Sequence, residues 1–436
     1  MNIKLLVAST AIAFASTAPA AELNARVDRE LDALAPRIIE WRRDFHQHPE
    51  LSNREFRTAK IVAEHLKRLG IEVQTGVAKT GVLGLLRGGK PGATIAMRAD
   101  MDGLPVTEQA DVPFMSKRTD TYNGQSVGVM HACGHDSHTS ILMGIAEALV
   151  KVRADLPGNV LFIFQPAEEG APEGEEGGAS LMLQEGVFDK YKPEVAFGLH
   201  VTSNLRVGQI GCRGGPLMAG SDAWRILVKG VQTHGARPWG GVDPIVTSAQ
   251  IVNALQTIVS RTVDISRNPA VVTVGMIKGG VRNNIIPDDV ELVGTIRTFD
   301  LQQRADIIMR MKRIAENVAI ANGATATFEL ISKGNPVVYN NPELTSQVVP
   351  SLKRVAGDAN VLAIPLETGA EDFAYFAQKV PSFFFFVGIT PKDKNLLTVP
   401  VNHSPFFYID ESGIPVGTHA FAQLALDYLQ AKATKL

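Results

Sequence analysis

The sequence predicts an α/β fold into which a second, smaller α+β domain is inserted. Before residue 214, short apolar segments alternate with amphipathic helical segments, as in a sheet covered by helices on both faces. Between 214 and 332 the strands lengthen and two long helices accompany them, which is typical of a compact α+β unit. The chain has 436 residues, more than one hydrophobic core usually serves. The alternative is one continuous domain with a long excursion.

The segments of the larger domain come first. Apolar residues in "LDALAPRIIEWRRDFHQ" recur at helical spacing, and a second helix is predicted over Glu55–Leu69. Strands are predicted at Gly81–Leu86 and Thr94–Met97. After them we expect a helix over Ser137–Val150 with Ser137 as its N-cap, a strand at Val160–Phe164, a helix over Gly178–Glu185 and a strand at Val195–Leu199.

The inserted domain is predicted from a second set of segments. Its strands are expected in "DAWRILVKG", "AVVTVGMIKG", "VELVGTIRTF" and at Ala324–Ile331, and its two helices over Pro244–Arg261 and Leu301–Asn322. The last helix of the chain is expected over Ile414–Leu429. The larger domain is therefore assigned residues 21–213 and 333–436, and the insertion residues 214–332.

Residues 1–20 have the layout of a secretory signal peptide. Lys4 precedes an apolar run, and the small residues Ala18 and Ala20 form an A-x-A cleavage site. The run is too short for a membrane span, which needs about 20 residues. We therefore expect a periplasmic or secreted protein with no membrane attachment after cleavage. An N-terminal core helix is the alternative interpretation.

Composition excludes two further classes of protein. The net charge is −2, so there is no basic surplus to neutralise nucleic-acid phosphates. Two cysteines are too few for a disulfide scaffold in an exported protein. A hydrophobic content of 45% and a charged content of 20% are typical of a globular chain.

Metal-ligating residue types follow several of the predicted strands. Glu168 and Glu169 come just after "NVLFIFQ", and His200 follows "VAFGL". Asp100 and Asp102 stand at the end of "TIAMRAD" and just beyond it. Open α/β sheets bind ligands outside the carboxyl ends of their strands, so these side chains are expected to gather at one edge.

The segment "GVMHACGHDSHTS" adds Cys133 and His135 just before a predicted helix. Thiolate and imidazole are ligands of divalent transition metals. A nucleophilic Cys133 with His135 as its base, which needs no metal, is the alternative.

Ten segments occur in this order: "RRDFHQHPELSNREFRT", "RADMDGLPV", "MHACGHDSHT", "QPAEEG", "FGLHV", "HGARPWGGVDP", "GGVRNNIIPD", "GTIRTF", "GAEDFAYF" and "VNHSPFF". They resemble successive blocks of the aminoacylase and carboxypeptidase-like metallohydrolases. The branch resembled contains the auxin-amino-acid conjugate hydrolases and the hippurate hydrolases. The resemblance covers nearly all of the chain after the signal peptide.

The resemblance implies a site for two divalent metal ions in the larger domain. Cys133 aligns with the bridging ligand, a position that is a carboxylate in the related carboxypeptidases. His135 and His200 align with ligands of one ion, and Glu169 and His403 with ligands of the other. Zinc, manganese, cobalt and nickel all suit this mixture of donor atoms.

Further roles follow from the same resemblance. Glu168 is implied as the general base, and Asp102 as a residue that orients the site from behind the ligands. His131 and His138 match no ligand position and are expected to be structural, and Asp100 is not counted as a ligand.

The inserted domain is implied to be a lid that also joins subunits in a homodimer or a higher homo-oligomer. Within it, His234 is expected to reach the partner's active site and stabilise an oxyanion. Asn284 and Arg297 match lid positions suited to binding a substrate carboxylate, although Arg297 also fits an exposed strand residue.

The activity implied is hydrolysis of the amide bond of small-molecule N-acyl amino acids, as in hippurate hydrolases and aminoacylases. A dipeptidase or carboxypeptidase acting on short peptides is the alternative. A non-catalytic periplasmic binding protein of the same fold is a third hypothesis, opposed by the presence of Glu168 and a complete ligand set.

Overall fold

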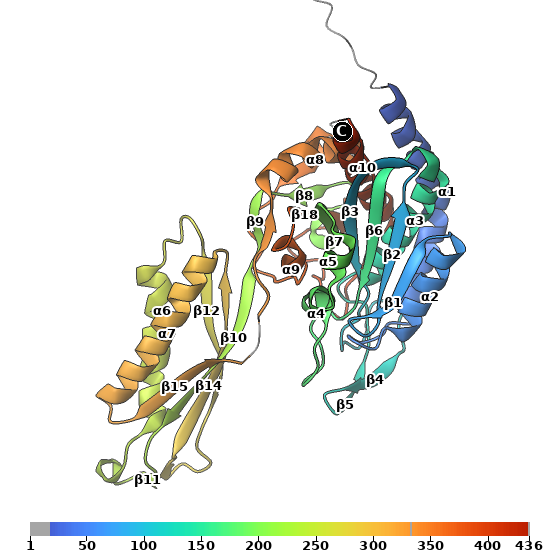
Figure 1. The fold of residues 1–436 in the computed structure, drawn as a ribbon. Coiled ribbons are helices and arrows are strands. Elements are labelled where there is room, and N and C mark those ends of the chain that lie inside the picture. Colours follow the sequence, from blue (N-terminus) through green and yellow to red (C-terminus); the bar gives the residue numbers. More distant parts are fainter. Residues whose placement is uncertain (1–17, 332–333, 435–436) are drawn as a thin grey trace, which may run out of the picture.

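The computed structural model describes residues 18–331 and 334–434, and within them it confirms the predicted fold class. A mixed sheet of eight strands forms the larger domain, and an antiparallel sheet of four strands forms the smaller one (Figure 1). The order in the larger sheet is β1-β2-β6-β3-β7-β18-β8-β17. Its strands are β1 (Glu72–Val77), β2 (Gly81–Arg87), β3 (Lys90–Asp100), β6 (Pro157–Gln165), β7 (Val195–Arg206), β8 (Ile210–Cys212), β17 (Val361–Ala363) and β18 (Ser382–Thr390).

The centre of this sheet is parallel and its flanks are not. Strands β6, β3, β7 and β18 run parallel to their neighbours in that group, whereas β1, β2 and β8 introduce antiparallel pairs. The carboxyl ends of the four central strands therefore meet at one edge of the sheet, where ligand sites of open α/β sheets form.

Helices cover both faces of the larger sheet, as the alternating sequence pattern predicts. One face packs against α1 (Ala18–Gln47), α2 (Phe56–Arg68), α3 (His135–Lys151), α8 (Pro342–Ala356) and α10 (Ile414–Ala433). The other face packs against the short helices α4 (Gly178–Gln184), α5 (Val187–Tyr191) and α9 (Ala374–Ala377).

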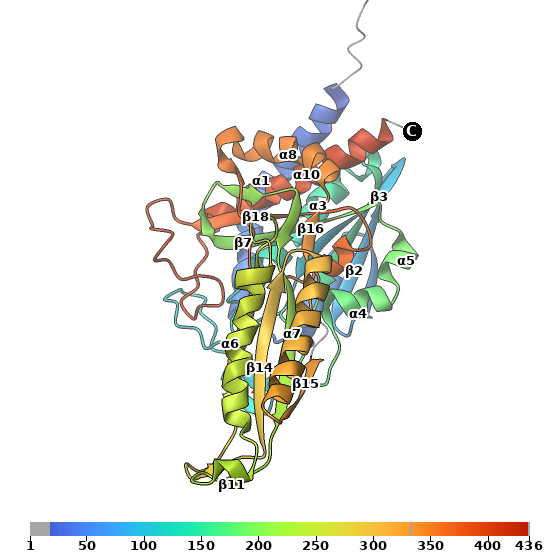
Figure 2. The ribbon, with the colours of Figure 1, turned by 90° about the vertical axis from the view of Figure 1, so that its left-hand side faces the viewer.

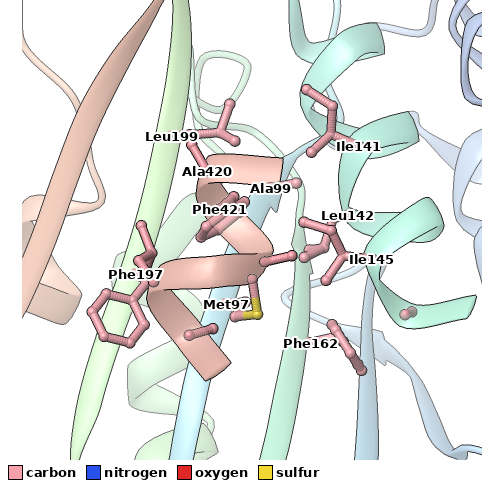
Figure 3. Packing of buried hydrophobic residues seen from close by; sticks show 14 of the residues in the cluster. Met97, Ala99, Ile141, Leu142, Ile145, Phe162, Phe197, Leu199, Ala420 and Phe421 are labelled. Atoms are coloured by element: carbon pink, nitrogen blue, oxygen red, sulfur yellow. The ribbon is translucent and has the colours of Figure 1, made fainter. Parts of the chain in front are cut away.

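Alternate residues of the buried strands point to opposite faces. On β3, Met97 and Ala99 face α3 and α10, whereas Ala96 faces the short helices. Figure 3 shows the first of these cores, with sheet residues packed against both long helices. Its labelled side chains are Met97, Ala99, Phe162, Phe197 and Leu199 from the sheet, Ile141, Leu142 and Ile145 from α3, and Ala420 and Phe421 from α10.

The smaller domain has a separate core. Its sheet has the order β12-β14-β10-β15, and α6 and α7 lie side by side on one of its faces (Figures 1 and 2). Buried side chains between helices and sheet include Trp224, Leu255 and Met311. The elements are β10 (Gly220–Lys229), α6 (Pro244–Thr262), β12 (Ala270–Lys278), β14 (Asp289–Thr298), α7 (Leu301–Ala321) and β15 (Thr325–Leu330).

Two short strand pairs complete the smaller domain and its connection to the larger domain. The chain reaches β10 through β9 (Gly215–Met218) and returns through β16 (Val338–Asn340), which pairs with β9. At the far end, β11 (Thr233–His234) pairs with β13 (Ile285–Ile286) (Figure 1). All four strands of the smaller sheet lie within the predicted range 214–332.

The expected N-cap of α3 is wrong. The helix begins at His135, and its N-cap is Gly134, with φ at 99°. A Cβ atom at Gly134 would lie 2.3 Å from Cγ2 of Val201, so both the backbone angle and the close packing require glycine. Ser137 instead lies within the first turn, where its N–H donates to the carbonyl of Gly134.

Other element boundaries also differ from the expectations. Helix α1 begins at Ala18, well before the predicted apolar stripe, and β7 continues to Arg206 instead of ending at Leu199. The hairpin of β4 (Thr119–Tyr122) and β5 (Gln125–Gly128) was not expected, because its residues are mostly polar. Residues 1–17 of the predicted signal peptide lie outside the described residues.

Both cysteines are buried and neither forms a disulfide. Within residues 18–331 and 334–434, no helix has the length and apolar character that crossing a membrane requires.

A histidine between α1 and α10 should make stability depend on pH. Nδ1 of His419 lies 2.7 Å from Asp28 Oδ1, and Nε2 lies 3.1 Å from Asp32 Oδ1. The hydrogen bond with Asp28, opposed by burial, raises the pKa of His419. A histidine whose pKa is higher in the folded state stabilises the fold at pH values below its unfolded-state pKa of about 6.5. This stabilisation is lost as the pH rises through the folded-state pKa.

We expect His419→Gln to lower the free energy of unfolding at pH 5.5 by about 0.5–1 kcal/mol, since the side chains of Asp28 and Asp32 are 42% and 74% exposed. At pH 9 the difference from the unchanged protein should nearly vanish. Denaturant unfolding of both proteins at the two pH values, with the same metal content, measures this difference in stability. A difference that does not depend on pH would contradict the raised pKa of His419.

Candidate metal centre

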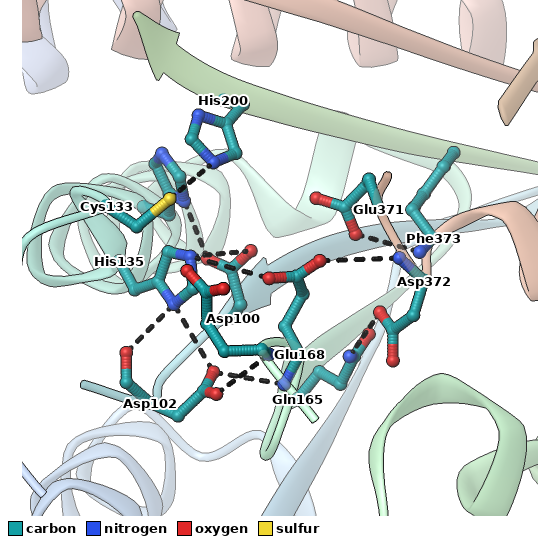
Figure 4. A network of polar contacts seen from close by, with 12 residues as sticks. Asp100, Asp102, Cys133, His135, Gln165, Glu168, His200, Glu371, Asp372 and Phe373 are labelled. Carbon is teal, nitrogen blue, oxygen red and sulfur yellow. Dashed lines mark hydrogen bonds and ion pairs between the residues drawn. The ribbon is translucent and has the colours of Figure 1, made fainter. Parts of the chain in front are cut away.

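The predicted ligands converge at the carboxyl ends of the central strands. Asp100 is the last residue of β3, and Glu168 and Glu169 follow β6. His200 stands on β7 just beyond the last residue that pairs with β3, and Cys133 precedes α3. Figure 4 shows Asp100, Cys133, Glu168 and His200 pointing toward one another from four separate segments.

Two groups of three potential ligands share Cys133. One consists of Cys133, His135 and His200, and the other of Cys133, Glu169 and His403, with ligand atoms within 4.8 Å of one another in each group. The sulfur lies 3.3 Å from Nε2 of His200 and 3.2 Å from Nε2 of His403. Nε2 of His403 lies 3.0 Å from Glu169 Oε1. The structure thus brings together all five residues predicted as ligands.

The chemistry of these donors fits divalent transition metals. Burial raises the pKa of the Cys133 thiol well above its ordinary value, and the carboxylates of Glu169 and Glu168 raise it further. A thiolate therefore forms here only beside a cation. Nε2 of His135 is buried without a hydrogen-bond partner, which leaves its lone pair available.

The surroundings of His135 also favour positive charge. Burial alone lowers the pKa of this imidazole, but the charges of Asp100 and Asp102 outweigh burial and raise it to about 10. A bound cation supplies the same charge as that proton. Sulfur, imidazole and carboxylate together admit zinc, manganese, cobalt or nickel.

Asp102 orients the potential ligands through hydrogen bonds, as the family resemblance led us to expect. Its carboxylate accepts hydrogen bonds from the backbone N–H groups of Glu168 at 3.1 Å and Glu169 at 3.0 Å. It also accepts one from the Ser52 hydroxyl. The Asp102 carbonyl lies 2.9 Å from Nδ1 of His135, which directs Nε2 toward Cys133 and His200.

Asp100 and His138 are structural rather than available ligands. The guanidinium of the buried Arg98 donates to Asp100 at 2.7 Å and to Glu371 at 2.8 Å. His138 lies with Nδ1 2.6 Å from Asp100 Oδ1, and its Nε2 accepts from the backbone N–H of Val201. Both ring nitrogens are thus occupied. His131 is fully buried and belongs to neither group that shares Cys133.

Sequence reasoning missed Glu55, which holds the loop that carries the two glutamates. This fully buried carboxylate accepts hydrogen bonds from the Ala167 N–H at 2.9 Å and the Thr80 hydroxyl at 2.5 Å. Ala167 adopts a left-handed φ of 53°, which is uncommon without glycine. Glu55 therefore stabilises a strained turn directly before Glu168. Burial, with the charge of Asp102, raises the pKa of Glu55 to about 8.

Asn402 was also missed, and it attaches the His403 loop to the rest of the site. Its side-chain amide donates to the carbonyls of Cys133 at 3.1 Å and Val201 at 3.2 Å. His403 itself has a left-handed φ of 74°, and its N–H donates to Ala132. The signal for Asn402 was its place beside His403 in "VNHSPFF".

Glu168 stands next to both groups without belonging to either. One oxygen lies 3.4 Å from the Asp372 N–H, and the other lies 3.8 Å from Nε2 of His135. Burial raises the pKa of Glu168 well above its ordinary value, and the carboxylates of Glu371 and Glu169 add to that shift. Its position and its affinity for a proton suit proton transfer.

A cleft of about 430 Å³ opens above the cluster. Besides Cys133, Glu168, Glu169, His200 and His403, its walls include Arg297 from β14 of the smaller domain. Arg297 is thus brought to the site.

His234 and Asn284 are not brought to it. Both are exposed at the end of the smaller domain remote from the main sheet, where the Gly235 N–H donates to the Asn284 carbonyl (Figure 1). Neither of them lines the cleft of their own chain.

Comparison with known proteins agrees with this architecture. The chain is 42% identical to thermostable carboxypeptidase 2 of Saccharolobus solfataricus, over 90% of this chain and 95% of that protein. It is 35% identical to IAA-amino acid hydrolase ILR1-like 2 of Arabidopsis thaliana, over 92% of this chain and 88% of that protein.

A solved structure with the same fold is the Bacillus subtilis YXEP protein, described as a dinuclear metal-binding peptidase of the M20 family. It shares 36% sequence identity and a TM-score of 0.76, over 92% of this chain and 99% of that one. Residues 96–427 also match the family described as peptidase family M20/M25/M40. The expected resemblance is confirmed, and the chain belongs to peptidase family M20/M25/M40, the hydrolases of amide bonds in peptides and acyl amino acids.

Proposed function

We propose that this M20 hydrolase cleaves N-acyl amino acids into a carboxylic acid and a free amino acid. The observation that supports this proposal is the pair of ligand groups sharing Cys133, with the Glu168 carboxylate beside them. The similarity to an IAA-amino acid hydrolase supports the acyl amino acid as the substrate class.

Five residues would hold two divalent ions, of zinc, manganese, cobalt or nickel. His135 and His200 would bind one, Glu169 and His403 the other, and Cys133 both. When bound, such ions polarise the amide carbonyl and lower the pKa of water. Asp102 keeps His135 and the Glu168–Glu169 backbone in place for this chemistry.

Glu168 is proposed to move the proton. As a carboxylate it takes a proton from the attacking water, and as an acid it passes that proton to the nitrogen of the leaving amine. The neighbouring carboxylates of Glu371 and Glu169 favour the protonated form, which makes the second transfer available.

Arg297 is proposed to bind the carboxylate of the substrate. It is half-buried in the cleft wall, and burial lowers the pKa of its guanidinium. A guanidinium binds a carboxylate through two parallel hydrogen bonds and therefore orients it.

His234 and Asn284 are proposed to act in the active site of a second copy in a homodimer. The lid offers a surface for such pairing, because β12 is an edge strand of its sheet. Large apolar side chains are exposed along β12 and near the end that carries His234, namely Ile277, Trp239 and Val281. Exposed apolar groups of this kind mark interaction surfaces.

A dipeptidase or carboxypeptidase acting on short peptides is the second candidate. The 42% identity to a thermostable carboxypeptidase favours it. The chemistry at Glu168 and the proposed ions would be the same. The presence of Glu168 opposes a non-catalytic binding protein.

A nucleophilic Cys133 is opposed by its surroundings. Burial and the adjacent carboxylates raise the pKa of its thiol and so disfavour the reactive thiolate. We also retain the proposal of export to the periplasm or beyond, which rests on the sequence pattern of residues 1–20.

Replacing Glu168 should lower turnover, whereas replacing its neighbour Glu169 should lower metal content. The purified protein should hydrolyse N-acetyl or N-benzoyl amino acids. Glu168→Ala should keep both ions and lose about 10²–10⁴-fold in kcat, the usual contribution of general acid–base catalysis. Glu169→Ala should instead lose bound metal. Elemental analysis of each variant beside kcat measures both effects.

The matched control is Glu173→Ala, which changes an exposed carboxylate of the same loop and should keep metal content and turnover. Equal loss of metal in the Glu168 and Glu169 variants would mean that the two roles are assigned wrongly. Full activity after exhaustive chelation would favour the cysteine nucleophile.

The role of His234 predicts complementation between two inactive proteins. His234→Ala should lose about 10²–10³-fold in kcat, the usual effect of removing one oxyanion donor. In a heterodimer with Glu168→Ala, one of the two sites has both groups intact and should be active. Differently tagged variants allow the heterodimer to be isolated and assayed. An inactive heterodimer would show that His234 does not act across subunits.

A further inference from the structure

One charge in the wall of the cleft has no role in the proposed mechanism. Most charged groups there belong to the ligand set, Glu168 is the proposed general base, and Glu371 is paired with Arg98. The remaining two are the guanidinium of Arg297 and the carboxylate of Glu367. Arg297 is assigned to the substrate carboxylate, which leaves Glu367.

Glu367 lacks a charged partner. Among the described residues, its carboxylate forms no ion pair, and its one hydrogen bond is a long one of 3.4 Å from the Gly369 N–H. It belongs to none of the groups of potential metal ligands found in the described residues. Its neighbour Met218, with which it forms a β-bridge, is buried and apolar. A half-buried carboxylate beside an apolar side chain is partly shielded from water and favours a cation nearby.

The backbone holds Glu367 firmly in the cleft wall. Its N–H donates to Leu217 at 2.9 Å, and its carbonyl accepts from Ala219 at 3.0 Å. Ser221, two residues after Ala219, pairs with Arg297 in the smaller sheet. One short segment, residues 217–221, connects β9 to β10 and therefore positions both Glu367 and Arg297.

We propose that Glu367 is a specificity-determining residue that selects substrates carrying a positively charged group in addition to their carboxylate. The inference rests on the proposed amide hydrolysis at this site. A substrate with both charges would pair with Glu367 and Arg297 together. A neutral acyl group or side chain would leave the Glu367 carboxylate uncompensated in a filled cleft, which disfavours that substrate.

The positive group can belong to either half of the substrate. It is a free α-amine if the acyl half is itself an amino acid, as in a dipeptide. It is a basic side chain if the released amino acid is lysine-like. Both are ammonium groups that a carboxylate binds in the same way, so matched pairs of substrates are needed to distinguish them.

The test compares kcat/KM within two such pairs. Alanyl-leucine is compared with N-propionyl-leucine, which lacks only the amine, and N-acetyl-lysine with N-acetyl-norleucine. The unchanged metal-loaded protein should prefer the cationic member of one pair by about tenfold or more, as expected for a hydrogen bond to a charged group. The pair that shows the preference identifies the source of the charge.

In Glu367→Gln the ratio within that pair should fall toward one. Glu343→Gln, which changes an exposed carboxylate of α8, should keep the ratio of the unchanged protein. No preference in either pair, or an equal change in both members with Glu367→Gln, would overturn the inference. If the unchanged protein cleaved alanyl-leucine but none of N-propionyl-leucine, N-acetyl-lysine and N-acetyl-norleucine, the proposed acyl amino acid activity would fail instead.

Discussion

Burial of several acidic groups around one thiol is the constraint on which the rest of the site depends. Cys133, Asp100, Asp102, Glu168 and Glu371 are all nine-tenths or more buried at the carboxyl ends of the central strands. Buried negative charges are costly unless a cation balances them. The fold supplies some of that balance from its own residues and leaves the remainder to the ligand cluster.

Arg98 supplies the balance on one side of the site. It pairs with Asp100, Glu371 and Asp372, which joins β3 to the segment before α9. Gln165 at the end of β6 donates to Asp372 and joins that strand to the same network (Figure 4). On the other side, the sulfur of Cys133 and the carboxylate of Glu169 lie against the imidazoles of His200 and His403. The protein thus separates carboxylates that stabilise the fold from donors whose chemistry suits a divalent metal ion.

The sequence predicted the fold class from local patterns, and the ligand cluster followed from the resemblance of its motifs to a known family. The alternation of apolar strands and amphipathic helices is visible in the amino-acid sequence itself, and Cys133, His200 and His403 stand in distinctive motifs. Glu55 and Arg98 could not be found in the same way, because each is an ordinary charged residue until the chain brings it against Ala167 or Glu371. The expectation for Ser137 was wrong for a related reason. The start of α3 is decided by the packing of Gly134 against Val201, which is a long-range contact.

The central claim is that the sulfur of Cys133 serves two metal ions at once. Anomalous X-ray diffraction from crystals of the metal-loaded protein, recorded at the absorption edge of the bound metal, tests it most directly. The account predicts two anomalous peaks, each about 2.3 Å from Sγ of Cys133 if the metal is zinc, one beside His135 and His200 and the other beside Glu169 and His403. A single peak, or peaks bound through Asp100 and Glu371 without contact to the sulfur, would contradict it.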